Sequence, residues 1–219
     1  MSAAGRSAMR AYLDFDDVLA ESFKALAAFA EEEFGATPAP GKETHFDLHV
    51  SLGLGEGQYE EFMERFHATR LLSVEEIPGA CETLRGWLAD GIEPVVVTGR
   101  PCSTHADSVL WLERRGLGGV EVLHVDKYAR FQEHEKAGTV PFGALRDYGF
   151  ALAVDDAPAA LDALSTARMC PYAVFSRPWN AGWKPPENGA APALATGDWR
   201  LIDALARRLA GLDAPSPCR

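Results

Sequence analysis

Short apolar runs alternate with longer amphipathic segments along most of the chain. The runs are rich in Val, Ala, Leu, Phe and Tyr and end in polar or turn residues, which is typical of buried strands. They predict strands at residues 11–14, 93–98, 120–125, 150–155 and 172–176. The intervening segments repeat apolar residues at helical spacing and predict helices at residues 20–34, 57–67, 79–90, 104–115, 157–167 and 198–211.

This order of elements predicts an α/β fold, a Rossmann-like, doubly wound parallel sheet with helices on both faces. Roughly 80 residues separate the first two strands, which is too many for a simple crossover. We therefore expect a small helical cap at residues 20–75, inserted after the first strand. Residues 9–19 and 76–212 would form the core domain, and residues 213–219 a loose tail.

Composition narrows the range of partners. Of the 219 residues, 47% are hydrophobic, and the net charge of −11 argues against an extended surface for a nucleic acid polymer. No apolar run approaches the roughly 20 residues that cross a bilayer, and no secretory signal is visible, so we expect no membrane partner and a cytoplasmic location. The four cysteines are scattered and favour reduced thiols, with Cys102 a plain buried thiol rather than a reactive one. A homodimer is compatible with the sequence.

Polar residues gather where the predicted strands end. The carboxyl ends of parallel strands share one edge of a sheet, where ligands bind. That edge would bring together Asp14, Asp16, Thr98, Asp126, Lys127, Asp155 and Asp156. Such a cluster of carboxylates suits Mg²⁺. The i, i+2 spacing lets Asp14 and Asp16 address one ligand, one as nucleophile and the other as general acid and base. Thr98 and Lys127 would stabilise charge on a phosphoryl group.

Four motifs, "YLDFDDV", "VVVTGR", a Lys after the third strand and "LAVDDAP", resemble those of the haloacid dehalogenase superfamily of phosphohydrolases over residues 11–180. The resemblance implies that Asp14 attacks phosphorus and forms an aspartyl-phosphate, while Asp16 protonates the leaving alcohol and then activates water. It also implies that Asp14, the Asp16 main-chain carbonyl, Asp155 and Asp156 hold Mg²⁺. Lys127 is favoured over Lys136 as the motif lysine. Asp17 stands where the family usually has Gly.

The segment "VFSRPWN" at residues 174–180, with "TGRP" and "VDDAP", resembles the 5′(3′)-deoxyribonucleotidase-like branch. That resemblance implies a small phosphorylated metabolite as partner, a nucleoside or deoxynucleoside monophosphate. A phosphatase of another small phosphate, such as a sugar phosphate, and a catalytically silent binding protein of this fold are the alternatives. Dehalogenation would use the same nucleophile without a metal, so the acidic cluster argues against it.

Candidate substrate contacts are Gly99, Arg100, Phe46 and Trp179. Arg100 would contact either a phosphate or a cap carboxylate. Trp179 and Asn180 would either line the pocket entrance or pack on the sheet edge, and Phe46 fits cap packing as well as substrate contact. Other assignments concern charge, packing and capping: Arg70 and Lys42 as positive charge for the substrate, Tyr59, Phe62, Met63 and Phe66 as the cap's own core, and Asp156 as the N-cap of the helix at 157–167.

Overall fold

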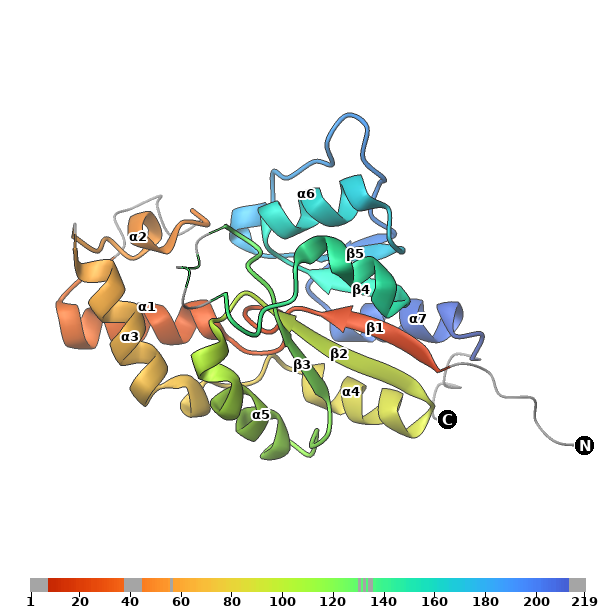
Figure 1. Ribbon diagram of the computed structural model, residues 1–219, viewed down its shortest axis with the longest axis horizontal. Coiled ribbons are helices and arrows are strands. Elements are labelled where there is room, and N and C mark those ends of the chain that lie inside the picture. The colour runs from red at the N-terminus through yellow and green to blue at the C-terminus, as the bar shows by residue number, and fades with distance from the viewer. Residues whose placement is uncertain are drawn as a thin grey trace, which may run out of the picture.

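The computed structural model describes residues 8–37, 45–55, 57–129, 131, 133 and 136–212. These residues form one parallel sheet in the order β3-β2-β1-β4-β5-β6 (Figure 1). The strands are β1 Met9–Leu13, β2 Ile92–Thr98, β3 Glu121–His124, β4 Phe150–Asp155, β5 Tyr172–Phe175 and β6 Leu194–Thr196. The strand order reverses between β1 and β4, and this is the point where open α/β sheets bind ligands.

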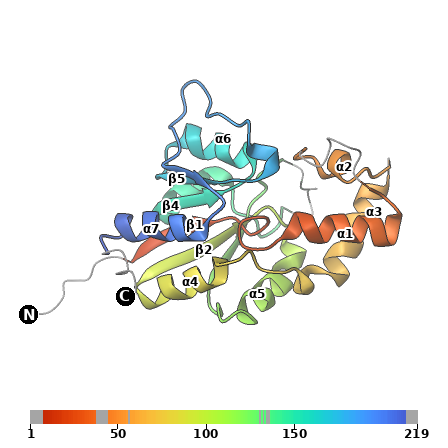
Figure 2. The same cartoon turned by 180° about the vertical axis from the view of Figure 1, so that it is seen from behind.

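The side chains of the strands alternate between two buried layers. Leu13 faces the layer that contains α4 (Ala80–Ala89), α5 (His105–Glu113) and α7 (Trp199–Leu209), whereas Tyr12 faces α6 (Pro158–Ala167). The 3₁₀ helix Phe142–Tyr148 joins α6 on that second face. Figures 1 and 2 show α4 and α6 on opposite sides of the sheet. The predicted α/β fold, with helices on both faces of a parallel sheet, is confirmed.

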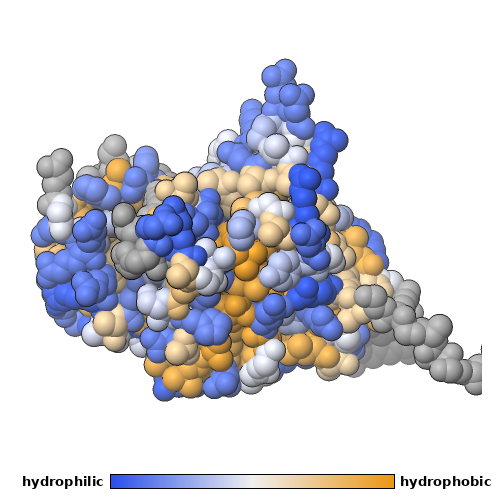
Figure 3. Space-filling view, viewed as in Figure 1, coloured by the Kyte–Doolittle hydropathy of each residue, from blue (hydrophilic) through white to orange (hydrophobic). Residues whose placement is uncertain are grey.

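The helices of residues 20–75 lie beyond the carboxyl ends of the strands (Figure 1). They are α1 (Ser22–Phe34), α2 (Leu48–Ser51) and α3 (Gln58–Thr69), followed by the 3₁₀ helix Leu71–Ser73. Rings on α1 and α3 form an aromatic cluster of Phe29, Phe34, Phe62 and Phe66. The face seen in the space-filling view is largely hydrophilic over α3 (Figure 3). Phe29, Phe62 and Phe66 of the cluster are buried.

Two linkers that run side by side connect the cap to the core. The Glu21 amide donates to the Glu75 carbonyl over 2.9 Å, and the Ile77 amide donates to the Leu19 carbonyl over 2.8 Å. These two hydrogen bonds hold the linker into the cap beside the linker out of it, next to the loop that follows β1.

The structure contains elements that the sequence expectations did not include, among them α2, β6 and the 3₁₀ helix Phe142–Tyr148, and it corrects one helix cap. β6 is a three-residue strand after a Pro-rich stretch, and its short length gave no periodic signal. The helix α6 begins at Pro158 after the N-cap residue Ala157, and no side chain caps it. The expectation that Asp156 caps α6 is therefore wrong; instead, Asp155 Oδ1 accepts a hydrogen bond from the Ala157 amide over 3.0 Å.

Some expectations concern segments outside these residues. Lys42 and the tail at 213–219 are not among the residues that the structure describes. None of the helices in the described part of the chain is long and apolar enough to cross a membrane.

Candidate active site

Three buried carboxylates meet at the switch point of the sheet. Asp14 directly follows β1, and Asp155 is the last residue of the neighbouring strand β4. The Asp14 amide extends the pairing of these strands by donating to the Val154 carbonyl over 2.9 Å. One carboxylate oxygen from each of Asp14, Asp155 and Asp156 lies within 4.8 Å of the other two. The pairing of β1 with β4 thus builds the cluster.

Lys127, which follows β3 closely, balances part of this negative charge. Its Nζ lies 2.9 Å from Asp14 Oδ1 and 2.7 Å from Asp155 Oδ2. Burial favours the neutral amine, but the two carboxylates outweigh it and raise the pKa of Lys127. Lys136 is exposed and lies 3.2 Å from Glu133. Of the two candidate lysines, only Lys127 contacts these aspartates.

The cluster fits a divalent cation. Burial, followed by repulsion from Asp155, raises the pKa of both Asp14 and Asp156 well above the ordinary range of a carboxyl group. One lysine therefore leaves an excess of negative charge. A hard cation with oxygen ligands would remove that excess, and Asp14, Asp155 and Asp156 offer the donors that Mg²⁺ prefers.

A pair of lysine variants tests this charge balance. Lys127→Met leaves buried carboxylates without their ammonium group, so we expect it to lower the free energy of unfolding by about 3–5 kcal/mol when a chelator is present. Mg²⁺ should restore part of that loss because it binds the folded state. Lys136→Met, an exposed control, should change the free energy by no more than about 0.5 kcal/mol. Equal effects in chemical unfolding would contradict the assignment of Lys127.

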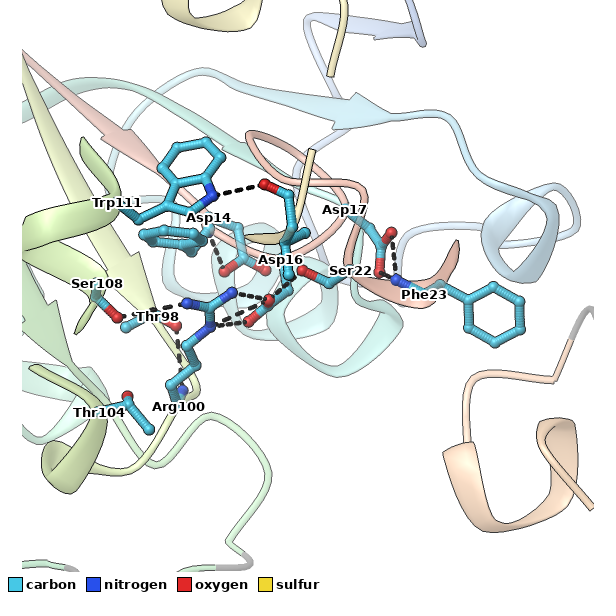
Figure 4. Close-up of polar contacts among 12 residues, drawn as sticks. Asp14, Asp16, Asp17, Ser22, Phe23, Thr98, Arg100, Thr104, Ser108 and Trp111 are labelled. Carbon is cyan, nitrogen blue, oxygen red and sulfur yellow. Dashed lines mark hydrogen bonds and ion pairs between the residues drawn. The ribbon is translucent and has the colours of Figure 1, made fainter. Parts of the chain in front are cut away.

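The carboxylate of Asp16 is paired with Arg100 (Figure 4). The buried guanidinium donates from Nε to both Asp16 oxygens over 3.1 and 3.0 Å, and from Nη2 to Oδ1 over 2.6 Å. It also lies 3.9 Å from the centre of the Phe15 ring. Burial would raise the pKa of Asp16, but Arg100 outweighs burial, so the pKa is lowered. The guanidinium thus contacts a carboxylate of the core rather than one of the cap.

Asp17 and Ser22 form further hydrogen bonds in the segment that links β1 to α1. The Ser22 hydroxyl, in the first turn of α1, donates to Asp16 Oδ1. The Asp17 carboxylate accepts from the Phe23 amide over 3.1 Å, and the Asp17 carbonyl accepts from Arg177 Nε over 2.7 Å. Asp17 has a φ of 57°, a conformation in which glycine is common, and these hydrogen bonds offset the strain. Burial raises the pKa of Asp17 to about 7.

Thr98 and Gly99 occupy the end of β2. Thr98 is fully buried, and its Oγ1 accepts a hydrogen bond from the Arg100 amide over 3.1 Å. A Cβ on Gly99 would lie 2.8 Å from the Tyr128 ring, so glycine permits this close approach. Gly99 lies on the pocket wall, whereas the buried Thr98 is not among the residues that line the pocket.

A pocket of about 910 Å³ lies between the cap and this edge of the sheet. Asp14, Asp16, Asp17 and Asp156 line it, as do the four candidate substrate contacts Gly99, Arg100, Phe46 and Trp179. Phe46 packs against Tyr128 with ring centres 5.5 Å apart, and Trp179 packs against Phe23 at 5.3 Å. Trp179 Nε1 also donates to Asp156 Oδ2 over 2.8 Å. Both aromatic pairs join the cap to the core across the pocket.

Several other assignments from the sequence are wrong in part. Tyr59 and Met63 are half-buried and line the pocket, whereas Phe62 is fully buried in the cap's aromatic cluster. Arg70 forms an ion pair with Glu32 of α1 at 2.9 Å and does not line the pocket. One face of α3 therefore serves the cap's core and a neighbouring face serves the pocket, which apolar spacing alone does not separate.

Two polar residues expected near the site have structural partners instead. Asn180 is buried and does not line this pocket, and its Nδ2 donates to the carbonyls of Asp156 and Phe175, each over 2.8 Å. Asp126 accepts from the Phe131 amide over 3.3 Å and does not line the pocket. Both residues support loops that carry the wall of the site.

Sequence reasoning missed several residues of the site, among them Tyr12, Ser22, Tyr128 and Arg177. Tyr12 donates from its hydroxyl to Asp155 Oδ2 over 2.6 Å, and Ser22 and Arg177 hold the loop after β1. Tyr128 lines the pocket next to Lys127. Strand alternation could have placed Tyr12 on the face opposite Leu13, but no spacing signal identifies a single hydrogen-bond partner.

Comparison with known proteins supports the fold. No protein-family model and no curated protein matches the sequence. A haloacid dehalogenase family hydrolase from Deinococcus radiodurans, solved with bound phosphate and sodium, superposes with a TM-score of 0.61 at 16% identity, over 94% of this chain and 99% of that one. A haloacid dehalogenase-like family protein from Streptococcus pneumoniae gives 0.57 at 16% identity, over 92% and 99%. A predicted phosphoglycolate phosphatase from Haemophilus somnus gives the same four values.

These similarities, at low identity, concern the fold. Together with the acidic strand ends, they define the class: an α/β protein with the haloacid dehalogenase-like fold. The fold that this resemblance implies is confirmed. The nucleotidase branch stays a prediction.

Proposed function

We propose that the protein is a Mg²⁺-dependent phosphomonoester hydrolase that works through an aspartyl-phosphate on Asp14. The observation that carries this proposal is the grouping of Asp14 and Asp156, which line a pocket, with the buried Lys127 and Asp155 next to them. A nucleophilic carboxylate, a neighbouring ammonium group and a set of oxygen donors are what phosphoryl transfer needs. The phosphate that the Deinococcus protein holds in the same fold adds support.

Two displacements at phosphorus make up the proposed reaction. Asp14 attacks phosphorus, the bond from phosphorus to the ester oxygen breaks, and Asp16 gives a proton to the leaving alcohol. Asp16 then takes a proton from water, which attacks the aspartyl-phosphate, so that inorganic phosphate leaves and Asp14 is regenerated. Lys127 and Thr98 stabilise the phosphoryl oxygens. Asp14, the Asp16 carbonyl, Asp155 and Asp156 would hold Mg²⁺, which would neutralise charge on the phosphoryl group.

The ion pair with Arg100 constrains the role of Asp16. A carboxylate that accepts hydrogen bonds from a guanidinium stays ionised, which suits the base of the second step. To act as an acid in the first step, Asp16 must leave Arg100 and turn toward the ester oxygen. Ser22 of the cap also binds Asp16, so movement of the cap linker would accompany this turn.

A nucleoside or deoxynucleoside monophosphate is the proposed substrate. The segment that resembles the nucleotidase branch contributes Trp179 to the pocket wall, and aromatic walls suit stacking on a base. A sugar phosphate is the alternative substrate. Dehalogenation is disfavoured because it gives the three clustered carboxylates no cation to bind.

Phosphate release from a substrate panel tests this function. The panel contains ribo- and deoxyribonucleoside monophosphates, sugar phosphates and an aryl phosphate, each with Mg²⁺ and with a chelator. We expect release that requires Mg²⁺ and is fastest for nucleoside monophosphates. Preference for a sugar phosphate would retain the reaction and reject the substrate, whereas no metal-dependent release from any ester would reject the reaction.

A further inference from the structure

The wall of the active-site pocket that would face the organic part of a substrate is apolar and acidic. Its apolar part includes Phe46, Tyr128, Phe23 and Trp179, which form the two aromatic pairs across the pocket. Aromatic rings in the wall favour an aromatic or apolar group over a sugar with many hydroxyls.

The charged part of this wall is negative. Glu60 and Glu64 lie one turn apart on α3, are exposed, and line the pocket from the cap. Asp107 of α5 lines it from the core. These carboxylates are additional to the aspartates at the floor of the pocket, which Lys127 and a bound cation would balance.

Arg100 is the single arginine or lysine among the described residues that line the pocket, and it is already occupied. Its guanidinium is buried, binds Asp16 through three contacts and lies over the Phe15 ring. The other basic side chains of the described wall are the histidines His45 and His67. A second anionic group on a substrate would therefore meet the carboxylates of this wall and no arginine or lysine that is free to pair with it.

From this arrangement we infer that the pocket selects singly phosphorylated esters of aromatic or apolar alcohols and rejects a second anionic group, with Glu60 and Glu64 as the residues that determine specificity. The inference rests on the proposed function and narrows its substrate class. It admits a nucleoside monophosphate, whose base and sugar are uncharged, and excludes bisphosphates and phosphorylated carboxylic acids.

A matched pair of substrates tests the inference. The probes are 2-phenylethyl phosphate and its para-carboxylate, which share the same leaving alcohol oxygen and differ in one remote charge. We expect kcat/KM to favour the uncharged ester by about tenfold at low ionic strength, because nearby carboxylates repel the second anion. The difference should lie in KM, because the remote group interacts equally in the ground state and the transition state.

Variants on one helix separate this effect from general acidity. The double variant Glu60→Gln/Glu64→Gln should reduce the preference to about threefold or less. Glu61→Gln on the same helix removes one charge from a residue that pairs with Arg65 outside the pocket, so it should leave the preference unchanged. By contrast, Glu60→Gln and Glu64→Gln, each removing one charge, should each reduce the preference. Added salt should also weaken the preference of the unmodified protein.

The possible outcomes distinguish a failure of the substrate inference from a failure of the proposed hydrolase function. Metal-dependent hydrolysis of both esters with equal efficiency, or with preference for the para-carboxylate, would overturn the inference and keep the proposed function. The same holds if the double variant and Glu61→Gln behave alike. Hydrolysis of neither ester, together with no release from the wider panel, would overturn both.

Discussion

Replacement of Asp14 with asparagine is expected to lower kcat/KM for phosphate release by about 10⁴-fold or more, because an amide cannot form the aspartyl-phosphate. The change preserves shape, and the amide oxygen can still accept the hydrogen bond from the Phe15 amide. It also removes one of three buried carboxylates that repel each other, so the folded protein should be at least as stable without Mg²⁺.

Asp126→Asn provides the matched control for this experiment. Asp126 is an aspartate that follows strand β3 at the same edge of the sheet, and it does not line the pocket. Its replacement should leave steady-state activity within about threefold of the unmodified protein. Retention of activity in Asp14→Asn, or an equal loss in both variants, would show that Asp14 is not the nucleophile.

Asp16→Asn is expected to have the second largest effect, a loss of about 10²–10⁴-fold in kcat/KM for alkyl esters, since general acid–base catalysis is worth that much. Esters of acidic phenols need little protonation of the leaving group. For those esters, phosphorylation of Asp14 should remain fast. Hydrolysis of the aspartyl-phosphate should be slow because no carboxylate activates water. The phosphorylated protein should therefore accumulate, which rapid acid quench and mass spectrometry would detect.

The dependence on the leaving group distinguishes this role from a structural one. An asparagine at position 16 can still accept a hydrogen bond from Arg100, so a purely structural role predicts a uniform and modest loss across all esters. A loss that does not depend on the acidity of the leaving alcohol would contradict the assignment of Asp16 as acid and base.

Backbone topology explains why part of the site could be predicted from the sequence. Asp14 and Asp155 end neighbouring parallel strands, so the spacing of the apolar runs was sufficient to bring them to one edge. Lys127 lies at the same edge because β3 belongs to the same sheet. The sheet itself positions residues that directly follow its strands, so their location can be predicted without knowing any side-chain contact.

Residues positioned by loops and by the cap could not be predicted in this way. Arg100 had two expected partners, and the structure gives it a third, Asp16, because the loop after β1 brings that carboxylate over the end of β2. Tyr59 and Phe62 share one apolar pattern on α3, yet the first lines the pocket and the second lies in the cap's core. How α3 is rotated against α1 decides between these positions, and periodicity does not encode that rotation.

The central claim is that Asp14 becomes phosphorylated during turnover. The most direct test is to mix the protein with Mg²⁺ and the best ester of the panel, quench in acid within the first turnover, and locate the added mass by peptide mass spectrometry. We predict one phosphoryl group on the peptide that contains Asp14, labile at alkaline pH and absent in Asp14→Asn. Turnover without any phosphorylated peptide, or a phosphoryl group on another residue, would contradict the account.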